Sequence, residues 1–248
     1  MSVAAAIDLN LLKTELDEYG FVILNNLIPA DEARGMADRL MEIMLQQPDA
    51  EKPVQNLRGV FNYLAPSDYE LFCTLVTNPT YQALARNKLG EGFQMAEVGC
   101  IWVKPGGGPG RLHADVPIGW FPRNSMPIPN VCFMVNCIWM LTDFTREDGG
   151  TLLLPFTHHS RQVPRPDVEY RHLLSAEGEA GSIVIFDGRI WHATGANVTN
   201  DRQRVGLSSG FHTAWMDPAA GNWHLMKRSV LDRLPAEVQE MNKHVVEG

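Results

Sequence analysis

The chain has 248 residues, 45% of them hydrophobic and 20% charged, so it is long enough to bury a substantial core and its composition is neither disordered nor fibrous. Its formal net charge of −8 argues against binding to nucleic acid or to acidic membrane surfaces, because both repel an acidic protein. Four cysteines without a CxxC pair are typical of reduced thiols, and the chain shows neither a signal-peptide pattern nor a long apolar run. We therefore expect a cytoplasmic protein with a small-molecule partner, and its oligomeric state stays open.

Residues 1–91 carry apolar side chains at three- and four-residue spacing, which predicts a mainly helical part. Three segments show this pattern: LLKTELDEYG, PADEARGMADRLMEIMLQQ and DYELFCTLVTNPTYQALARNKLGEG. Asp31 and Glu32 follow Pro29 and fit the first turn of the second helix. Between the first two segments, GFVILNNLIP is a β-branched and aromatic run, which predicts a strand that begins after Gly20.

Residues 92–216 change character, since the segments become shorter and strand-like. Clusters of Gly, Pro, Asp and Asn separate five such segments: QMAEVGCIWVKP, VCFMVNCIWML, GTLLLP, GSIVIFDGRIWHATG and RVGLSSGFHTAW. Many short strands with turns between them predict a sandwich or a barrel. Residues 217–248 return to helical spacing and are expected to form a short capping segment. Because the sequence shows no internal repeat, we interpret residues 1–248 as one domain.

The stretch RLHADVP places His113 and Asp115 two positions apart, directly after the glycine-rich loop KPGGGPG. If a strand begins here, its period of two puts both side chains on one face and Ala114 on the other. The two side chains would then converge as metal ligands. The alternative is that they hydrogen-bond each other or cap the loop, and the HxD motif alone does not separate the two interpretations.

A second histidine strengthens the metal interpretation. His192 lies near the end of the strand-like run SIVIFDGRIWH, where a lone histidine is ordinarily a structural hydrogen-bonding residue. Together with His113 and Asp115 it completes two imidazoles and one carboxylate, the ligand set of non-haem Fe(II) oxygenases. This set leaves three octahedral positions open for a 2-oxoacid and O2. The three residues are therefore predicted to hold Fe(II).

The far carboxylate of such an oxoacid then needs a cation. Arg204 lies 12 residues after His192, at the start of RVGLSSGF, and a guanidinium makes a bidentate, charge-assisted contact with a buried carboxylate. Arg202 shares the parity of Arg204, but it belongs to the polar run TNDRQ, where a solvated charge is expected. Arg204 is therefore the predicted contact.

With these motifs the chain resembles the phytanoyl-CoA dioxygenase family of Fe(II)- and 2-oxoglutarate-dependent oxygenases over most of its length. HAD matches the HxD motif of the family, WHATGAN its distal histidine, and Arg204 its cosubstrate arginine. REDGGTLLLPFTHHS matches an inner strand followed by a turn with a histidine, and YGFVILNNLIPADEARGMADRL matches the N-terminal strand and helix. The usual PGSH turn is PFTHHS here, so that His159 takes the histidine position.

The resemblance implies a mainly β fold with flanking helices, namely a double-stranded β-helix (a cupin-like jelly roll) with N-terminal helices buttressing one sheet. It implies Fe(II), 2-oxoglutarate and O2 as cofactor and cosubstrates. Thr151 in EDGGT matches a position where a hydroxyl helps Arg204 bind the distal carboxylate, although it would otherwise be an ordinary strand residue. Asn136 in MVNCIWML lies on an inner strand, where its amide could reach the oxoacid or simply fill the strand.

The segment GWFPRNSMPIPN directly follows two of the predicted metal ligands and holds three prolines. A long loop beside a site commonly forms a lid or a substrate wall, so we predict substrate contact for Trp120 and Phe121. The apolar character of this loop favours a small, fairly apolar metabolite, such as a natural-product intermediate. The sequence shows no dense basic patch near the site of the kind that would contact the phosphates of an acyl-CoA.

Three functions follow from these features. The favoured one is an oxygenase that hydroxylates a C–H bond with release of succinate and CO2, and a substrate held differently would undergo desaturation, epoxidation or cyclisation. The second is a cupin-like metal-dependent hydrolase or isomerase, which would use the same His/Asp/His site without 2-oxoglutarate and without Arg204. The third is a non-catalytic binding module. Release of succinate that depends on 2-oxoglutarate separates the first from the other two.

Overall fold

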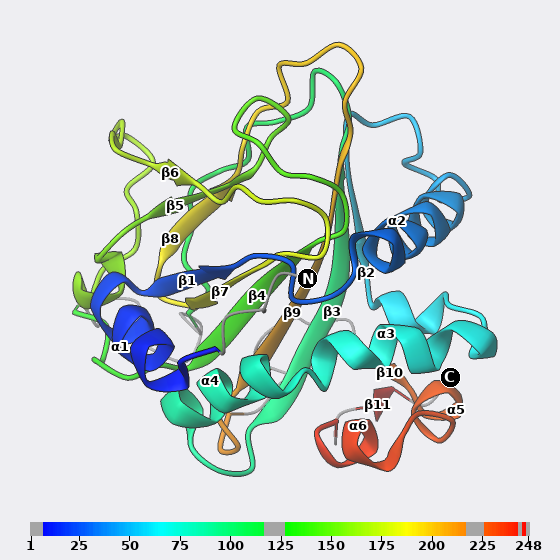
Figure 1. The fold of residues 1–248 in the computed structure, drawn as a ribbon. Helices are drawn as coiled ribbons and strands as arrows, with labels where there is room; N and C mark the ends of the chain where they lie inside the picture. The colour runs from blue at the N-terminus through cyan, green and yellow to red at the C-terminus, as the bar shows by residue number, and fades with distance from the viewer. Residues whose placement is uncertain (1–6, 117–126, 217–225, 243–244, 247–248) are drawn as a thin grey trace, which may run out of the picture.

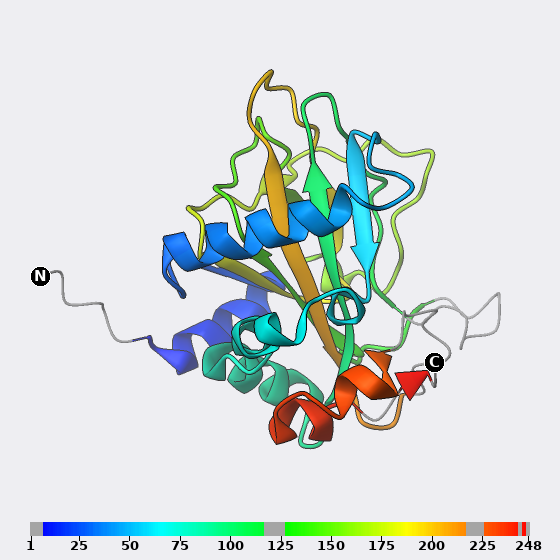
Figure 2. The same ribbon diagram turned by 90° about the vertical axis from the view of Figure 1, so that its right-hand side faces the viewer.

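The computed structural model describes residues 7–116, 127–216, 226–242 and 245–246, and its core consists of two antiparallel sheets that lie face to face (Figure 1). The larger sheet has the strand order β1-β7-β4-β9-β3-β2, and the smaller sheet has the order β6-β5-β8. Helices cover the outer face of the larger sheet (Figures 1 and 2). This is the expected mainly β architecture with flanking helices.

The bounds of the helices and strands are as follows. The helices are α1 (Leu9–Tyr19), α2 (Ala30–Met44), α3 (Tyr69–Val76), α4 (Pro79–Leu89), α5 (Arg228–Leu231) and α6 (Ala236–Glu240). The strands are β1 (Phe21–Leu24), β2 (Val54–Arg58), β3 (Gln94–Val103), β4 (Met134–Met140), β5 (Thr151–Leu154), β6 (Leu174–Ser175), β7 (Ile183–Asp187), β8 (Trp191–Thr194), β9 (Arg204–His212), β10 (Met226–Lys227) and β11 (Val245–Val246).

Local capping explains where the N-terminal helices begin and end. Asp8 accepts hydrogen bonds from two backbone N–H groups in the first turn of α1, and Gly20 ends the helix in the left-handed region at φ 85°. The third predicted helical segment is divided into α3 and α4, because Pro79 has no N–H for a continuous helix and Asn78 caps the new one. The predicted strand after Gly20 is β1.

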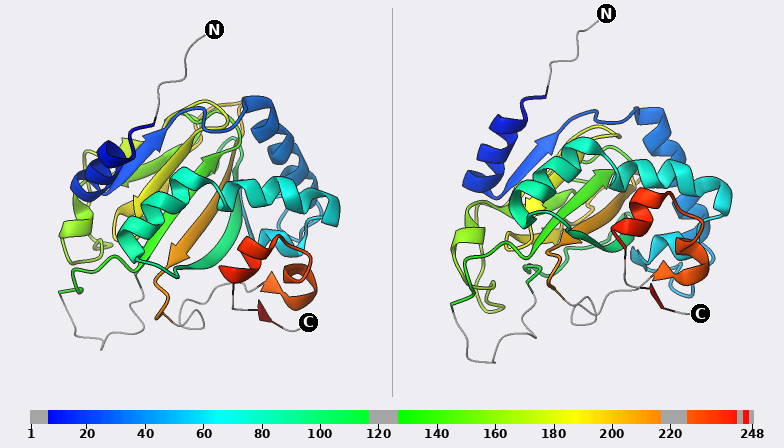
Figure 3. Two further views of the ribbon diagram at one scale, coloured as in Figure 1. Left: turned by 60° about the horizontal axis from the view of Figure 1, so that its bottom comes forward. Right: turned by 90° about the horizontal axis from the view of Figure 1, so that it is seen from below.

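The larger sheet is buried on both faces, as β4 illustrates. Its alternate residues Cys137 and Trp139 pack with the helices in the main core, whereas Ile138 and Met140 belong to a second core between the two sheets. All seven residues of β4 are buried for this reason. Seen from below, α3 and α4 cross the outer face of the sheet, and the C-terminal elements lie beside them (Figure 3). No helix in the described part of the chain combines the length and the apolar character that crossing a bilayer requires.

Two segments differ from the expectation in a way that shapes the cavity between the sheets. The run GSIVIFDGRIWHATG is two strands, because a turn closed by Ile190 N–H donating to Asp187 C=O (2.8 Å) moves the chain from the larger sheet to the smaller one. The segment Val54–Arg58 forms the edge strand β2 beside β3, although its sequence gave no strong strand pattern. Both sheets consequently contribute side chains to one cavity.

Candidate active site

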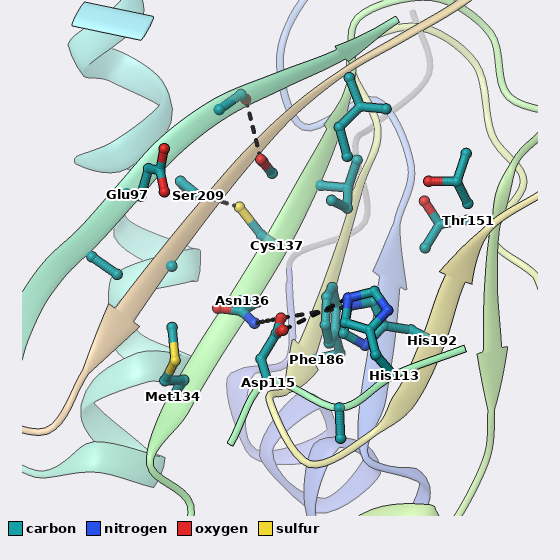
Figure 4. A pocket seen from close by; sticks show the side chains of 18 of the residues that line it. Glu97, His113, Asp115, Met134, Asn136, Cys137, Thr151, Phe186, His192 and Ser209 are labelled. Carbon is teal, nitrogen blue, oxygen red and sulfur yellow. Dashed lines mark hydrogen bonds and ion pairs between the residues drawn. The ribbon is translucent and has the colours of Figure 1, made fainter. Parts of the chain in front are cut away.

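A cavity of about 550 Å³ lies between the two sheets and brings together six of the eight predicted site residues. These are His113, Asp115, Asn136, Thr151, His192 and Arg204. Figure 4 shows the two histidines and Asp115 converging at one end of this cavity, with Thr151 further along it. The other two, Trp120 and Phe121, lie outside the described residues.

The two histidines face each other because their backbones pair directly. The N–H of His113 donates to the C=O of His192 (3.0 Å), and the N–H of His192 donates to the C=O of His113 (2.8 Å). His113 is therefore a single bridge residue, and residues 111–116 do not form the expected strand. The N–H of Asp115 donates to the C=O of Gly188 (2.7 Å) in the turn before β8. Both sides of the site are thus fixed by backbone hydrogen bonds.

The side chains present a set of atoms that fits a metal ion. Nδ1 of His113 lies 2.9 Å from the carbonyl of Arg111, and Nδ1 of His192 lies 2.9 Å from the carbonyl of Ile190. Both Nδ1 atoms therefore carry the proton, which leaves the lone pair of each Nε2 free to bind a metal. These Nε2 atoms lie 3.7 and 3.4 Å from the two oxygens of Asp115. One nitrogen or oxygen from each residue lies within 4.8 Å of the others.

Electrostatic coupling keeps Asp115 ionised. Burial opposes the charged form, but the neighbouring His192 and His113 hold the pKa of Asp115 below its ordinary value. Burial and the proximity of His192 lower the pKa of His113, whereas Asp115 raises the pKa of the buried His192 against the effect of burial. A carboxylate beside two imidazoles is the donor set that divalent iron accepts.

Asn136 holds the carboxylate of Asp115. Its Nδ2 donates to Asp115 Oδ2 at 2.7 Å, across the cavity from β4 (Figure 4). Gly210 faces Asn136 on the neighbouring strand β9, and a Cβ atom at this glycine would collide with Asn136 Oδ1. The glycine therefore leaves the space in which the amide reaches the carboxylate.

Arg204 is a buried cation whose hydrogen-bond donors find only some of their partners among the described residues. It is 1% exposed; its Nη2 donates to Thr151 Oγ1 at 2.6 Å, and its guanidinium lies 4.2 Å from the ring centre of Phe144. Among the described residues its Nε and Nη1 have no hydrogen-bond partner. Burial lowers the pKa of the guanidinium to about 10. Arg202, in contrast, is half exposed, lies 3.8 Å from the carboxylate of Asp148 and does not line the cavity.

The cavity also has a polar wall that the sequence did not reveal. Asn56 and Arg58 of β2 and Glu97 of β3 line it. In the structure Gln55 and Leu57 are buried whereas Asn56 and Arg58 are exposed. The sequence VQNLR does not alternate apolar and polar residues, because its valine and leucine are three positions apart. Five residues in a polar context are a weak signal, and pairing with β3 defines this strand.

Comparison with known proteins identifies the fold and the chemistry of this cavity. The sequence model described as Phytanoyl-CoA dioxygenase (PhyH) matches residues 16–205. The chain belongs to the phytanoyl-CoA dioxygenase family. This dioxygenase is 31% identical over 239 residues to dioxygenase af480 of Aspergillus fumigatus, a match that covers 92% of the chain and 72% of that protein. It is 23% identical to dioxygenase andF of Emericella variicolor, in a match that covers 91% of this chain and 81% of that protein.

Solved structures agree with the family. HygX of Streptomyces hygroscopicus, with nickel and 2-oxoglutarate bound, superposes with a TM-score of 0.65 at 13% identity over 96% of both chains. The 2-oxoglutarate-dependent carbocyclase SnoK of nogalamycin biosynthesis superposes with a TM-score of 0.63 at 16% identity, over 86% of this chain and 87% of its own. These matches confirm the double-stranded β-helix. The PhyH dioxygenase is thus an Fe(II)- and 2-oxoglutarate-dependent oxygenase.

Proposed function

We propose that this oxygenase hydroxylates a C–H bond of a small, fairly apolar metabolite, such as a natural-product intermediate. One oxygen atom of O2 enters the product and the other enters succinate, while the first carboxyl group of 2-oxoglutarate leaves as CO2. The supporting relatives are fungal dioxygenases and enzymes whose structures hold nogalamycin or hygromycin B compounds. We further propose that residues 1–248 act as one domain. The four free, buried cysteines support a reducing, cytoplasmic location.

In this proposal His113, Asp115 and His192 hold Fe(II). The iron, when bound, supplies the activation of O2 that is coupled to oxidative decarboxylation of 2-oxoglutarate. The protein orients its ligands: the backbone carbonyls of Arg111 and Ile190 hold the proton on each Nδ1. Asn136 orients the carboxylate of Asp115 through its 2.7 Å hydrogen bond. An additional contact of Asn136 with the oxoacid stays a prediction.

The observation that carries the proposal is the incomplete pairing of Arg204. A guanidinium buried with two unpaired donor nitrogens is unfavourable unless an anion binds beside it. The distal carboxylate of 2-oxoglutarate supplies this anion, and the hydroxyl of Thr151, already bonded to Arg204, lies next to the same position. A metal-dependent hydrolase or isomerase would need the three ligands and would gain nothing from this arginine.

Trp120 and Phe121 are proposed as substrate contacts on the basis of the sequence alone. The described part of the cavity has apolar groups that suit the proposed substrate, since Val116, Met134 and Met216 line it. A variant Trp120→Ala is expected to weaken binding of the prime substrate more than binding of 2-oxoglutarate.

The proposal is tested anaerobically with Fe(II) and two oxoacids of equal chain length. 2-Oxoglutarate is expected to produce the visible metal-to-ligand absorption band, and 2-oxopentanoate, which carries a methyl group in place of the distal carboxylate, is expected to bind far more weakly. Equal affinity for both compounds would refute the role of Arg204. With O2 and a library of candidate metabolites, succinate release that rises with one compound supports the oxygenase over a hydrolase or isomerase.

A further inference from the structure

The wall of the cavity formed by β2 and β3 contains an ion pair that the proposed chemistry does not use. Nε of Arg58 donates to both carboxylate oxygens of Glu97 at 3.0 Å, and Nη2 adds a further hydrogen bond to Oε2. The Glu97 side chain is 12% exposed and that of Arg58 is 41% exposed. Figure 4 shows Glu97 on β3, with β9 and β4 between it and Asp115. The pair therefore faces the metal site from across the cavity.

The sheet is built so that these two side chains meet inside the cavity. Arg58 pairs with Gly99 of β3, and because Gly99 has no side chain, the guanidinium can extend diagonally over it to Glu97. The register between β3 and β9 shifts between Met95 and Val98, so Ala96 and Glu97 form a bulge. Such a bulge re-aims side chains, and both of its residues line the cavity.

The register of the strands gives the distance between this pair and the metal site. Asn136, which holds Asp115, lies on β4; Gly210 follows on β9, and the bulge with Glu97 follows on β3. Two strand spacings separate Asn136 from Glu97, which is about 10 Å. Gly210, which lies between them, lines the same cavity. A molecule about 10 Å long, two strand spacings, can therefore reach from the metal site to the ion pair.

The charge of the pair determines what it can bind. A carboxylate near Arg58 would be repelled by Glu97, and an ammonium group near Glu97 would be repelled by Arg58. A hydroxyl group suits both, since its oxygen accepts from the guanidinium while its O–H donates to the carboxylate. Arg58 and Asn56 also line a neighbouring groove of about 210 Å³, which Gln47 and Tyr63 border, so a substituent beyond the hydroxyl has room.

We propose that Arg58 and Glu97 are the specificity-determining pair for the prime substrate and bind an uncharged hydroxyl group about 10 Å, or two strand spacings, from the reacting C–H bond. The inference rests on the proposed function in placing the reaction at His113, Asp115 and His192. It narrows the substrate class to an elongated molecule with an apolar body and a hydroxyl group at the far end.

The test uses calorimetric titration of the metal-free protein with three rigid probes of matching length: 4-phenylphenol, biphenyl-4-carboxylate and 4-phenylbenzylammonium. The wild type is expected to bind 4-phenylphenol most tightly. Glu97→Gln removes the negative charge that repels an anion, so the Kd of biphenyl-4-carboxylate relative to that of 4-phenylphenol should fall at least fivefold. Arg58→Gln removes the positive charge, so the Kd of 4-phenylbenzylammonium relative to that of 4-phenylphenol should fall at least fivefold.

A matched control is Asp167→Asn. Asp167 forms an ion pair of the same type with Arg165, but both side chains are more than half exposed and neither lines the cavity. This variant should leave all ratios unchanged. Unchanged ratios in Glu97→Gln and Arg58→Gln, or absence of binding of every probe to the wild type, would refute the inference. Because no metal or 2-oxoglutarate is present, failure of the proposed function would instead appear as a missing absorption band.

Discussion

Replacing Arg204 by methionine should have opposite effects on the stability of the protein and on its affinity for 2-oxoglutarate. The pKa of the buried guanidinium falls well below its ordinary value, to about 10, which corresponds to a cost of about 3 kcal/mol for keeping the charge in the fold. At pH 7 the group is protonated in the folded and the unfolded state, so this cost is present in full and decreases only as the pH rises above 10. Removing the charge at similar volume should therefore stabilise the metal-free protein, by about 1 kcal/mol or more.

Binding of 2-oxoglutarate should weaken at the same time. Loss of a charge-assisted contact with a buried carboxylate costs on the order of 2 to 5 kcal/mol, which is roughly a thirtyfold or greater increase in Kd. Thermal unfolding of the metal-free protein should show Tm higher by about 2 to 4 °C for each kcal/mol gained, and calorimetric titration gives the Kd. Arg202→Gln, which changes an exposed arginine outside the cavity, should alter neither quantity appreciably. A Kd for Arg204→Met within threefold of the wild type, or a loss of stability together with affinity, would contradict the reasoning.

Three further predictions concern the rest of the site and the fold. His192→Ala should abolish succinate release that depends on the prime substrate, because two ligands do not keep the facial geometry; retained turnover in that assay would disprove the assignment. Gly210→Ala should push the amide of Asn136 away from Asp115 and weaken Co(II) binding about tenfold or more, the usual loss when a partner of a metal ligand is disturbed, and an unchanged Co(II) titration would contradict this. Burial lowers the pKa of His158 below its ordinary 6.5, so its neutral form gives stability above pH 6.5 that is lost as the pH falls below it. The free energy of unfolding, measured with urea, should therefore fall less between about pH 7.5 and 5.5 in His158→Gln than in the wild type. An equal fall in both proteins would exclude His158 as the cause.

The sequence predicted the features that depend on local patterns. The apolar spacing of the N-terminal helices, the start of β1 after Gly20 and the pairing of the HxD motif with a distal histidine were all readable without the structure. The parity argument put the side chains of His113 and Asp115 on one face, and in the structure both residues line the cavity, although the expected strand is a single bridge. Even the choice of Arg204 over Arg202 followed from the polar surroundings of Arg202, and the structure places only Arg204 in the cavity.

Features that depend on pairing between distant segments could not be predicted. Arg58 and Glu97 are 39 residues apart, and their contact depends on the register between β2 and β3 and on the bulge in β3. Neither leaves a local signal, because a bulge is defined only by the partner strand. The turn between β7 and β8, in contrast, carries a local signal, because Asp187 and Gly188 interrupt the apolar run that was expected to be one strand. The polar wall of the cavity therefore appeared only in three dimensions.

The reciprocal pairing of His113 and His192 also bears on how such an enzyme can diversify. The two imidazoles lie opposite each other because the peptide groups of these two residues exchange both hydrogen bonds. The two flanking loops are themselves paired, since the N–H of Gly110 donates to the C=O of Thr194 and the N–H of Gly106 donates to the C=O of Asn197. An insertion or deletion in KPGGGPG or TGANVTND would therefore disturb the pairing that continues to the ligands. A shift of the pairing by one residue would turn one imidazole to the opposite face. Changes of length that adapt the cavity to new compounds while the iron ligands stay in place are therefore expected outside these two paired loops.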